Sequence, residues 1–600
     1  MKHLLYLKKY FWKYRWRLLL GALFVGLANA FRVLQPQVIR EALDHVVERV
    51  QHYRQTGGIA AHPEAFEELS HQIARFGLIV IGLAILMGLF MFFMRQTIIV
   101  MSRLVEYDMR KELFAHYTRL DLAFFRRHST GDLMSRISED VSKVRMFLGP
   151  AILYGLDLTF LFVFTISSML RVSVPLTLWS LLPLPLLSLS IYWVSSLMNR
   201  RSEHIQQQLG VLTSTAQEVF SGIRVVKSYA QEEAMGQHFA RQCEAYRQKT
   251  LALTRVDAFF YPLMVLMIGA STIITVYVGG LYAVKGEITA GNIAEFVIYI
   301  NMLTWPVTAI GWIASLTQQA AAAQKRINEI LYTEPAVADP PPRRAAPTPM
   351  QRVSGHIVFE KVGFVYPDSG IRVLREVSFE VLPGQKVAIV GRTGAGKTTI
   401  ADLLVRMYDV SEGRIWLDGR DLREYPLHFL RRNIGYVPQD VFLFSETVLA
   451  NIAFGQPNLS RVEAETYAKY AAVHGDIIGL PQGYDTVVGE RGVMLSGGQK
   501  QRISLARAFA KQPQIFLLDD CLSAVDTHTE SRILHYLNET LADKTAILIT
   551  HRIYGMLTFD QIFVLEDGQI VEQGKHEELL ARGGYYAELF EQQAAAANGL

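Results

Sequence analysis

Residues 386–399, KVAIVGRTGAGKTT, decide the fold of the second half of this 600-residue chain. The apolar run Lys386–Val390 predicts a β-strand, and Gly391–Thr398 has the spacing of a phosphate-binding loop that opens a helix. In such a loop backbone N–H groups surround the phosphates, Lys397 neutralises them, and the Thr398 hydroxyl binds Mg²⁺. A purely structural turn is the alternative, and the flanking strand and helix argue against it. The predicted nucleotide-binding residues are Gly391, Arg392, Thr393, Gly394, Ala395, Gly396, Lys397, Thr398 and Thr399.

Two later segments supply the remaining parts of an ATP site. Ile515–Asp519 is an apolar strand ending in a carboxylate, so Asp519 is predicted to hold Mg²⁺ through water and Asp520 to polarise the attacking water. Leu495–Gln499 precedes the helical run Lys500–Lys511, and two consecutive glycines at a helix start make a backbone cradle for a γ-phosphate. One ATP does not need both loops from one subunit, so the sequence predicts two domains that enclose ATP head to tail.

The first half of the chain is predicted to cross a membrane. Half of the residues are hydrophobic, the mean hydropathy is +0.18 and 19% are charged, which indicates a membrane part joined to a soluble part. Abundant aromatic residues exclude disorder as the main state, and two cysteines, Cys243 and Cys521, exclude a disulfide framework. The net charge of +4 does not point to nucleic acid as a partner. Stretches of about 20 apolar residues occur at residues 18–38, 76–101, 148–170, 174–198, 259–281 and 293–316.

Basic residues predict the orientation of these six spans. Lys and Arg are concentrated in residues 1–17, 102–146 and 199–257, so the N-terminus and both long loops are expected in the cytoplasm. Residues 1–17 predict an interfacial helix, with a cleaved signal peptide ending near residues 28–30 as the alternative. The chain is therefore predicted to be a multi-pass protein of the cytoplasmic membrane.

Three ionisable residues fall in or near the spans. Arg95 is expected to snorkel to the interface, while Arg32 and Asp157 either face a water-filled cavity or make a structural interhelix contact. Four prolines are predicted to kink helices; they are Pro36, Pro183, Pro185 and Pro306.

The cytoplasmic loops read as helical extensions of the spans, with breaks at residues 129–132 and 221–222 that each end one helix and start a short crosswise one. Six prolines in residues 333–353 predict an extended connector. Beyond it, strands at 386–390, 514–518 and 545–550, and a hairpin turning at Asp567-Gly568, predict an α/β domain.

The order of these motifs resembles a known family. The phosphate loop, Leu495–Gln499, Asp519-Asp520, Ser523–Asp526 and His551 together resemble the nucleotide-binding domain of ABC transporters. The six spans with two long cytoplasmic loops resemble a multidrug-exporter-type (type IV) half-transporter. The resemblance implies a six-helix transmembrane domain at 1–330, a linker at 331–353 and an α/β P-loop nucleotide-binding domain at 354–600. A complete transporter of this kind has two such halves, so the chain is expected to dimerise.

The resemblance also implies roles for single residues. Tyr366 resembles the aromatic residue that stacks on adenine, and Gln439 resembles the glutamine that touches Mg²⁺ and senses the membrane domain. His551 resembles the switch histidine at the γ-phosphate, and Asp526 lies in the D-loop. Leu495, Ser496, Gly497, Gly498 and Gln499 resemble the signature that closes over ATP on the other subunit. Thr486–Gly492, with Glu490, resembles the exporter X-loop, and the breaks near 129–132 and 221–222 resemble coupling helices.

One residue departs from the family pattern. The usual glutamate after the strand aspartate is Asp520 here, whose side chain is one methylene shorter. A misplacement near 1 Å can cost about 100-fold in rate, so this chain's own site is predicted to bind ATP but hydrolyse it poorly. This resembles the degenerate-site subunit of heterodimeric exporters, whose partner carries Glu at that position. The alternatives are a self-sufficient homodimer, an ATP-gated channel or a regulatory subunit.

The predicted function is ATP-driven export by alternating access, with ATP and Mg²⁺ as cofactors. Residues of the last two spans suit amphipathic drugs or lipids, although ordinary interhelix packing is the commoner role for any one of them. They are Tyr261, Met264, Tyr299, Asn301 and Trp305.

Overall fold

The computed structural model describes residues 2–55, 63–340, 353–489, 492, 495–540, 543–551 and 559–598. The chain packs into two compact units. The first consists of Met1–Ala115 and Leu133–Thr333, and the second consists of His116–Asp132 and Glu334–Leu600. The second unit therefore takes a short helical segment from the first half of the sequence, which places that segment beside the nucleotide-binding motifs.

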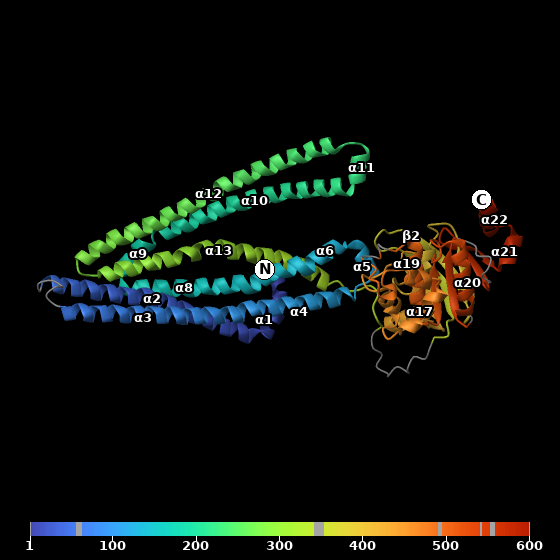
Figure 1. Ribbon diagram of the computed structural model, residues 1–600, viewed down its shortest axis with the longest axis horizontal. Helices are drawn as coiled ribbons and strands as arrows, with labels where there is room; N and C mark the ends of the chain where they lie inside the picture. The colour runs from blue at the N-terminus through green and yellow to red at the C-terminus, as the bar shows by residue number, and fades with distance from the viewer. Residues whose placement is uncertain are drawn as a thin grey trace. The chain divides into compact units, whose positions relative to one another are not determined.

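Long helices make up the first unit (Figure 1). Helices α2 and α3 lie side by side, as do α10 and α12, which the short α11 joins. The helices are α1 Lys8–Lys13, α2 Arg15–Gln55, α3 Pro63–Met94, α4 Val100–Tyr117, α6 Thr130–Ser135, α7 Val141–Met146, α8 Ile152–Val172, α9 Val174–Leu181, α10 Pro183–Ser221, α11 Ile223–Ser228, α12 Glu232–Val284 and α13 Ala290–Leu331. A 3₁₀ turn covers Lys2–Leu7, and π-helical turns cover Arg95–Ile99, Arg136–Asp140 and Phe147–Ala151.

Five helical stretches within the described residues are long and apolar enough to cross a membrane. They are Arg15–His52, Glu67–Tyr117, Thr130–Val172, Glu232–Val284 and Ala290–Leu331. These contain five of the six predicted spans. The predicted span 174–198 lies on α9 and the start of α10, which are separated at Leu182. Proline lacks the N–H that continues a helix, so Pro183 and Pro185 explain this break, and the predicted count of six is not confirmed.

The predicted break at 221–222 is confirmed, whereas near 129–132 the chain is interrupted at His128 and Ser129, and the short helix precedes this interruption instead of following it. Helix α10 ends at Ser221, and Gly222 separates it from α11, whose six residues form a short turn before α12. Near the first break, the short α5, Leu122–Arg127, ends before α6 begins at Thr130. Helices α10 and α12, of 39 and 53 residues, exceed the length that a bilayer requires.

Two groups of polar contacts hold segments of the first unit together: one joins the N-terminal lead to α4, and the other joins α13 to Asp140. Tyr6 and Tyr10 from the N-terminal lead donate hydrogen bonds of 2.6 and 2.5 Å to Glu112 on α4. Arg326 on α13 donates hydrogen bonds from Nε and Nη2 to the two carboxylate oxygens of the buried Asp140, and the Nε–Oδ2 distance is 2.8 Å. The lead is therefore helical and packed on α4, while its predicted place at a membrane interface stays a prediction.

The second unit contains two sheets. The six-stranded sheet has the order β10-β9-β3-β8-β7-β6 and is parallel except for the β9–β10 hairpin. The four-stranded antiparallel sheet has the order β2-β1-β4-β5. The strands are β1 Ile357–Val365, β2 Arg372–Val381, β3 Lys386–Val390, β4 Glu412–Leu417, β5 Arg420–Asp421, β6 Ile434–Val437, β7 Ile515–Asp519, β8 Thr545–Thr550, β9 Gln561–Glu566 and β10 Gln569–Gly574. The predicted strands and the hairpin at Asp567-Gly568 are confirmed.

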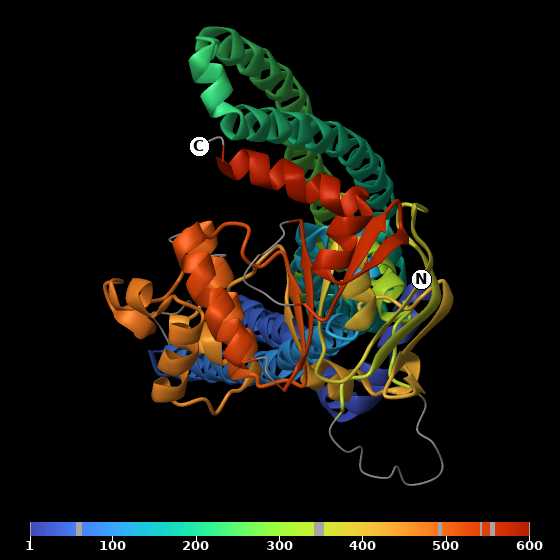
Figure 2. The same cartoon turned by 90° about the vertical axis from the view of Figure 1, so that its right-hand side faces the viewer.

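Helices surround these sheets, and those coloured orange lie to one side of them in Figure 2. They are α14 Lys397–Leu404, α15 Leu427–Asn433, α16 Val448–Ile452, α17 Arg461–Tyr470, α18 His474–Ile478, α19 Gly497–Ala510, α20 Thr527–Thr540, α21 His576–Arg582 and α22 Tyr585–Asn598. Helix α19 contains most of the predicted helix 500–511 and begins three residues earlier, at the signature glycines.

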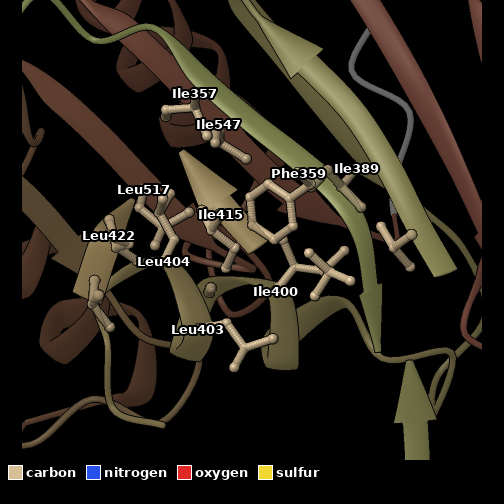
Figure 3. Close-up of a cluster of buried hydrophobic side chains, with 14 of the residues drawn as sticks. Ile357, Phe359, Ile389, Ile400, Leu403, Leu404, Ile415, Leu422, Leu517 and Ile547 are labelled. Carbon is tan, nitrogen blue, oxygen red and sulfur yellow. The ribbon is translucent and has the colours of Figure 1, made fainter. Parts of the chain in front are cut away.

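One hydrophobic core of the second unit lies between the two sheets (Figure 3), and a second joins the six-stranded sheet to the helices α16–α20. Phe359 on β1 stacks on Phe379 of β2 at 4.4 Å, and Phe379 meets Phe563 of β9 at 4.9 Å. Ile400 and its neighbours on α14 fill the same layer. Apolar burial of this kind is the main stabilising term in folding, and here it fixes the helix that follows the phosphate loop.

Candidate nucleotide site

The phosphate loop joins β3 to α14 at the carboxyl edge of the parallel sheet. Gly391 has φ 156°, and a Cβ there would lie 2.1 Å from the carbonyl oxygen of Leu565, so only glycine fits. Lys397, the first residue of α14, donates hydrogen bonds of 2.8 Å to the carbonyls of Gly391 and Arg392. Burial lowers the pKa of Lys397, and the charges of Asp519 and Asp520 act in the opposite direction. The ammonium is thus held inside a loop whose backbone wraps around it.

Asp519 ends β7 and is almost completely buried. Burial raises the pKa of Asp519 to about 6, although the Thr398 hydrogen bond opposes the rise; the charge of Asp520 adds to it. Among the described residues, nothing donates a hydrogen bond to Asp519 Oδ2. A buried carboxylate oxygen of this kind beside a threonine hydroxyl is a suitable ligand for a hard divalent cation.

Asp520 faces His551 across the site. Asp520 Oδ1 lies 3.0 Å from Nδ1 of His551, which follows the last residue of β8. The backbone of Asp520 is left-handed, with φ 47°, a conformation that costs a non-glycine residue on the order of 1–3 kcal/mol. Its N–H donates to the Ile549 carbonyl at 2.8 Å, and its carbonyl accepts from Ser523 Oγ at 3.0 Å. Strand β8 and the loop after Asp520 therefore hold the backbone of Asp520 in place.

These groups line one cavity of about 290 Å³. It brings together most of the predicted residues: Tyr366, Thr393, Gly394, Gly396, Lys397, Thr398, Thr399, Gln439, Asp519, Asp520 and His551. Val373, Ile549 and Thr550 also line it and were not predicted, although Thr550 directly precedes His551 and could have been inferred from the strand. The loop residues Gly391, Arg392 and Ala395, the segment Leu495–Gln499 and Asp526 are not among the lining residues.

Tyr366 is positioned by contacts that local sequence does not reveal. Its hydroxyl shares a hydrogen bond of 3.0 Å with Thr399 Oγ1. The guanidinium of Arg126, on α5, lies 5.0 Å from the Tyr366 ring centroid and 5.6 Å from that of Tyr408. Arg127 also donates to the Pro367 carbonyl at 2.6 Å. Helix α5 is thus packed within the second unit directly against the predicted adenine-stacking residue.

The signature segment forms a capped helix start. Ser496 Oγ accepts a hydrogen bond from the Gln499 N–H at 3.2 Å, and the Gln499 side chain accepts one from the Ser496 N–H at 3.0 Å. A Cβ on Gly498 would lie 2.5 Å from the Ala524 carbonyl oxygen, so glycine is required where the two loops touch. The N–H groups of Gly497 and Gly498 stand in the first turn, where α-helices leave donors without intrahelical partners. They are therefore suited to bind an anion outside this chain's own cavity.

Part of the predicted X-loop lies outside the described residues, including Glu490. The first residue of this loop, Thr486, contacts the start of α16, because the Val448 N–H donates to the Thr486 carbonyl at 3.0 Å. Of the predicted substrate residues, Tyr299 is fully buried, and its hydroxyl lies 3.2 Å from the Val33 carbonyl on α2 and 2.9 Å from Glu295 on its own helix, whereas Tyr261 is exposed. Tyr299 thus serves helix packing.

Comparison with known proteins agrees with this arrangement. Residues 18–307 match the ABC transporter transmembrane region family, and residues 374–523 match the ABC transporter family. The chain is 34% identical over 588 residues to the multidrug resistance-like ATP-binding protein MdlA of Escherichia coli, covering 97% of this chain and 95% of that protein. It is 36% identical over 488 residues to the ATP-dependent lipid A-core flippase of Pseudomonas syringae, covering 80% of this chain and 79% of the flippase.

A solved structure of a bacterial Atm1-family ABC exporter with ATP bound is also similar. Its TM-score is 0.78 at 29% identity, covering 97% of this chain and 98% of that one. The fold and the site define a membrane transporter powered by an ATP-binding domain. This chain belongs to the ABC transporter family and has the exporter architecture, with a multi-pass helical membrane region followed by an ATP-binding domain.

Proposed function

We propose that this chain is one half of a dimeric exporter that uses ATP to move small amphipathic molecules, such as drugs or lipids, across the cytoplasmic membrane. Relatives named for multidrug resistance and for lipid A-core flipping support this substrate class. Residues 1–330 form the membrane domain, 331–353 the linker and 354–600 the nucleotide-binding domain. The N-terminus and the nucleotide-binding domain face the cytoplasm, as the distribution of basic residues indicates.

The nucleotide cavity accounts for the roles of its residues. Tyr366 stacks on adenine, while Lys397 and the phosphate loop bind the phosphates. Thr398, Gln439 and Asp519 hold Mg²⁺, and their oxygen donors suit this cation. When bound, Mg²⁺ neutralises charge that develops on the phosphates. His551 contacts the γ-phosphate and holds Asp520 beside it.

Two observations support a dimer. Leu495–Gln499 offers an anion cradle that does not line this chain's own ATP cavity, so a second subunit is needed to use it. The tip around α11 presents large apolar side chains to solvent, with Phe220, Val225 and Tyr229 each more than 60% exposed. Exposed apolar clusters of this kind mark interaction sites, and we assign this one to the nucleotide-binding domain of the partner.

The position of Asp520 carries the proposal that the dimer is a heterodimer. Its carboxylate lies 3.0 Å from His551, and its backbone is held by main-chain bonds to Ile549 and Ser523, so the short side chain starts from a fixed Cα. A glutamate would extend farther by one methylene. Since a 1 Å misplacement can cost about 100-fold in rate, this site binds ATP and hydrolyses it slowly. The partner subunit supplies the glutamate for the competent site.

The transport cycle follows from this assignment. ATP binding closes the two nucleotide-binding domains across the phosphate loops and Ser496–Gln499. The cytoplasmic helices transmit closure through Gln439 and the coupling helices, and an inward-facing cavity opens outward. Hydrolysis at the competent site resets the transporter, while the slow site keeps the nucleotide-binding domains in contact.

Steady-state ATPase activity in lipid tests this proposal. We expect the purified wild type to be nearly silent, Asp520→Glu to be clearly active, and Asp520→Asn to stay silent as the matched control. Cross-linking reports the oligomeric state. A wild-type dimer with a rate that Asp520→Glu barely improves would establish the second candidate, a self-sufficient homodimer. That candidate is favoured by the presence of Asp520, Gln439 and His551 in one cavity.

A further inference from the structure

A second cavity, of about 320 Å³, lies among the helices of the membrane unit. Helices α2, α3, α8 and α13 and the π-helical turn after α3 supply its walls. It is lined by Ala28, Asn29, Arg32, Met87, Met91, Met94, Arg95, Tyr154, Asp157 and Trp305. The sequence left open whether Arg32 and Asp157 face a cavity or only a neighbouring helix. Both line this cavity, and Arg95 joins them.

One wall carries a buried acceptor that has no partner. Asn29 is 1% exposed, and its Nδ2 donates to Asp157 Oδ1 at 2.7 Å and to the Val25 carbonyl at 3.0 Å. Its Oδ1 is buried and accepts no hydrogen bond from any residue in the described part of the chain. Leaving a buried amide oxygen unpaired is costly. The cavity therefore offers an acceptor for a hydroxyl, an amine or a water that enters it.

The charges of the cavity do not cancel. Arg32 and Arg95 each carry a permanent positive charge, because guanidinium groups are not deprotonated in proteins. Asp157 offsets one of them, and its carboxylate is already engaged by Asn29. The lining thus has a net charge of about +1, and because Arg95 is exposed and Arg32 is half-buried, the cost of an unneutralised charge falls mainly on Arg32. A bound anion would relieve this cost.

The rest of the lining is apolar and adaptable. Tyr154 and Trp305 meet edge to face at 5.4 Å, and three methionines stand near them on α3. Methionine side chains adjust to ligands of different shape. Arg95 begins the π-helical turn Arg95–Ile99, a departure from α geometry that often marks functional sites. Two arginines and several apolar side chains therefore line one space.

We propose that this cavity binds the anionic group of an amphipathic molecule, with Arg32 and Arg95 holding the anion, Asn29 accepting from a neighbouring donor, and the methionines and Trp305 contacting the apolar part. The proposal rests on the proposed export function, because it names the class of substrate. The volume is at the lower end for ligand pockets, so the cavity takes the head of the molecule and its first apolar atoms.

Binding of dansyl-labelled undecanoic acid to the full chain in phosphatidylcholine nanodiscs, without nucleotide, tests this assignment. The part of the tryptophan-to-dansyl energy transfer that is lost in Trp305→Phe reports binding in the cavity, because Trp305 lines it and the other six tryptophans do not. The neutral methyl ester and the cationic choline ester of the same acid are the matched probes. We expect the acid to bind at least about tenfold more tightly than the choline ester, since hydrogen bonds to charged groups are stronger than those between neutral groups.

Variants give opposite expected signs. Arg32→Gln and Arg95→Gln should each weaken binding of the acid by about tenfold and leave the methyl ester nearly unchanged. Asp157→Asn should tighten binding of the acid and weaken the choline ester. Arg17→Gln, an exposed arginine outside the cavity, is the control for total charge and should have no effect.

Equal binding of the acid and the choline ester by the wild type would overturn the proposal, and this comparison needs no variant to fold. Unchanged affinity in both arginine variants would also overturn it, as would complete displacement of the acid by excess inorganic phosphate, which would assign the site to a free anion. Replacing part of the phosphatidylcholine by phosphatidylglycerol distinguishes a lipid from a soluble amphiphile as the source of the anion. Because no ATP is present, a failure here is separate from a failure of ATPase activity, which concerns the proposed function.

Discussion

Replacing Asp402 by asparagine should stabilise the nucleotide-binding unit at neutral pH. Asp402 lies on α14, behind the phosphate loop, and is 7% exposed. Burial raises the pKa of Asp402 from 3.8 to about 6; the positive charge of Arg126 works against the rise, and the charge of Asp519 adds to it. The folded protein therefore binds a proton at Asp402 more tightly than the unfolded chain does.

The sign and size of the effect follow from this difference. Burial penalises only the ionised carboxylate. The full destabilisation is therefore present at pH values above the folded-state pKa of about 6, and it disappears at pH values below the unfolded-state pKa of 3.8. The shift of about 2 units corresponds to about 3 kcal/mol at pH 7.5, and to about half of that at pH 5. An asparagine side chain does not ionise, so Asp402→Asn should recover up to this amount. For a unit of this size, 1 kcal/mol moves the thermal midpoint by roughly 2–4 °C.

Scanning calorimetry of the full chain in nanodiscs measures the effect. The transition of the nucleotide-binding unit is identified by its upward shift with ATP, since a ligand that binds only the folded state stabilises it. We expect Asp402→Asn to raise this midpoint by roughly 6–12 °C at pH 7.5 and by about half as much at pH 5. Asp543→Asn, at an exposed aspartate, is the matched control and should change neither value.

A midpoint that falls at pH 7.5, or a gain of equal size at both pH values, would refute this reasoning. The first result would mean that the ionised carboxylate makes a contact worth more than its burial costs. The second would mean that the substitution acts through packing and not through ionisation. Arg126→Gln provides an independent check, because loss of its positive charge should lower the midpoint at pH 7.5 more than at pH 5.

Three further outcomes are expected. Cys243 is exposed and lies in the predicted cytoplasmic loop 199–257, while Cys521 is buried. A membrane-impermeant maleimide should therefore label the protein poorly in intact cells and label Cys243 after permeabilisation. Full labelling in intact cells would contradict a cytoplasmic position for this loop. The Gln501 side chain on α19 makes hydrogen bonds to Ser523 and Ala524 in the loop after Asp520. Gln501→Ala should therefore destabilise the nucleotide-binding unit by about 1–3 kcal/mol, and Gln501→Glu should destabilise it by less. Both effects are measured as shifts of the same calorimetric midpoint. Arg326→Ala removes the main partner of the buried Asp140. Because Arg326 is half exposed, this variant should lower the free energy of unfolding by at most about 3 kcal/mol, and Arg326→Lys should lower it by less. Equal thermal midpoints for the two variants would show that the charge at this position is unimportant.

Much of the nucleotide site could be predicted because the residues that bind the nucleotide are grouped in short segments of the sequence. A strand that runs into a glycine-rich loop, as at Lys386–Thr398, fixes a backbone conformation within a few residues. The strands that carry Asp519 and His551 were predicted from apolar runs, and parallel pairing of β3, β8 and β7 then brings their carboxyl ends together. Local pattern and sheet topology agree here, which explains the success.

Other features were not predictable in this way. The break at Leu182 divides an apolar stretch that composition alone joins, because the missing N–H of Pro183 acts on the backbone and not on hydropathy. The contact of Arg126 with Tyr366 joins residues 240 positions apart, and no spacing rule records it. The packing of α5 into the second unit decides that contact.

The sequence by itself determined the family, the ATP-binding motifs and the presence of an apolar membrane half, because each depends on residues that are neighbours in the chain. Only the tertiary structure decided that Arg32, Arg95 and Asp157 share one cavity, and that Asp520 points at His551. These arrangements depend on how separate helices and strands pack, and packing is set by the sum of many weak contacts between distant parts of the chain.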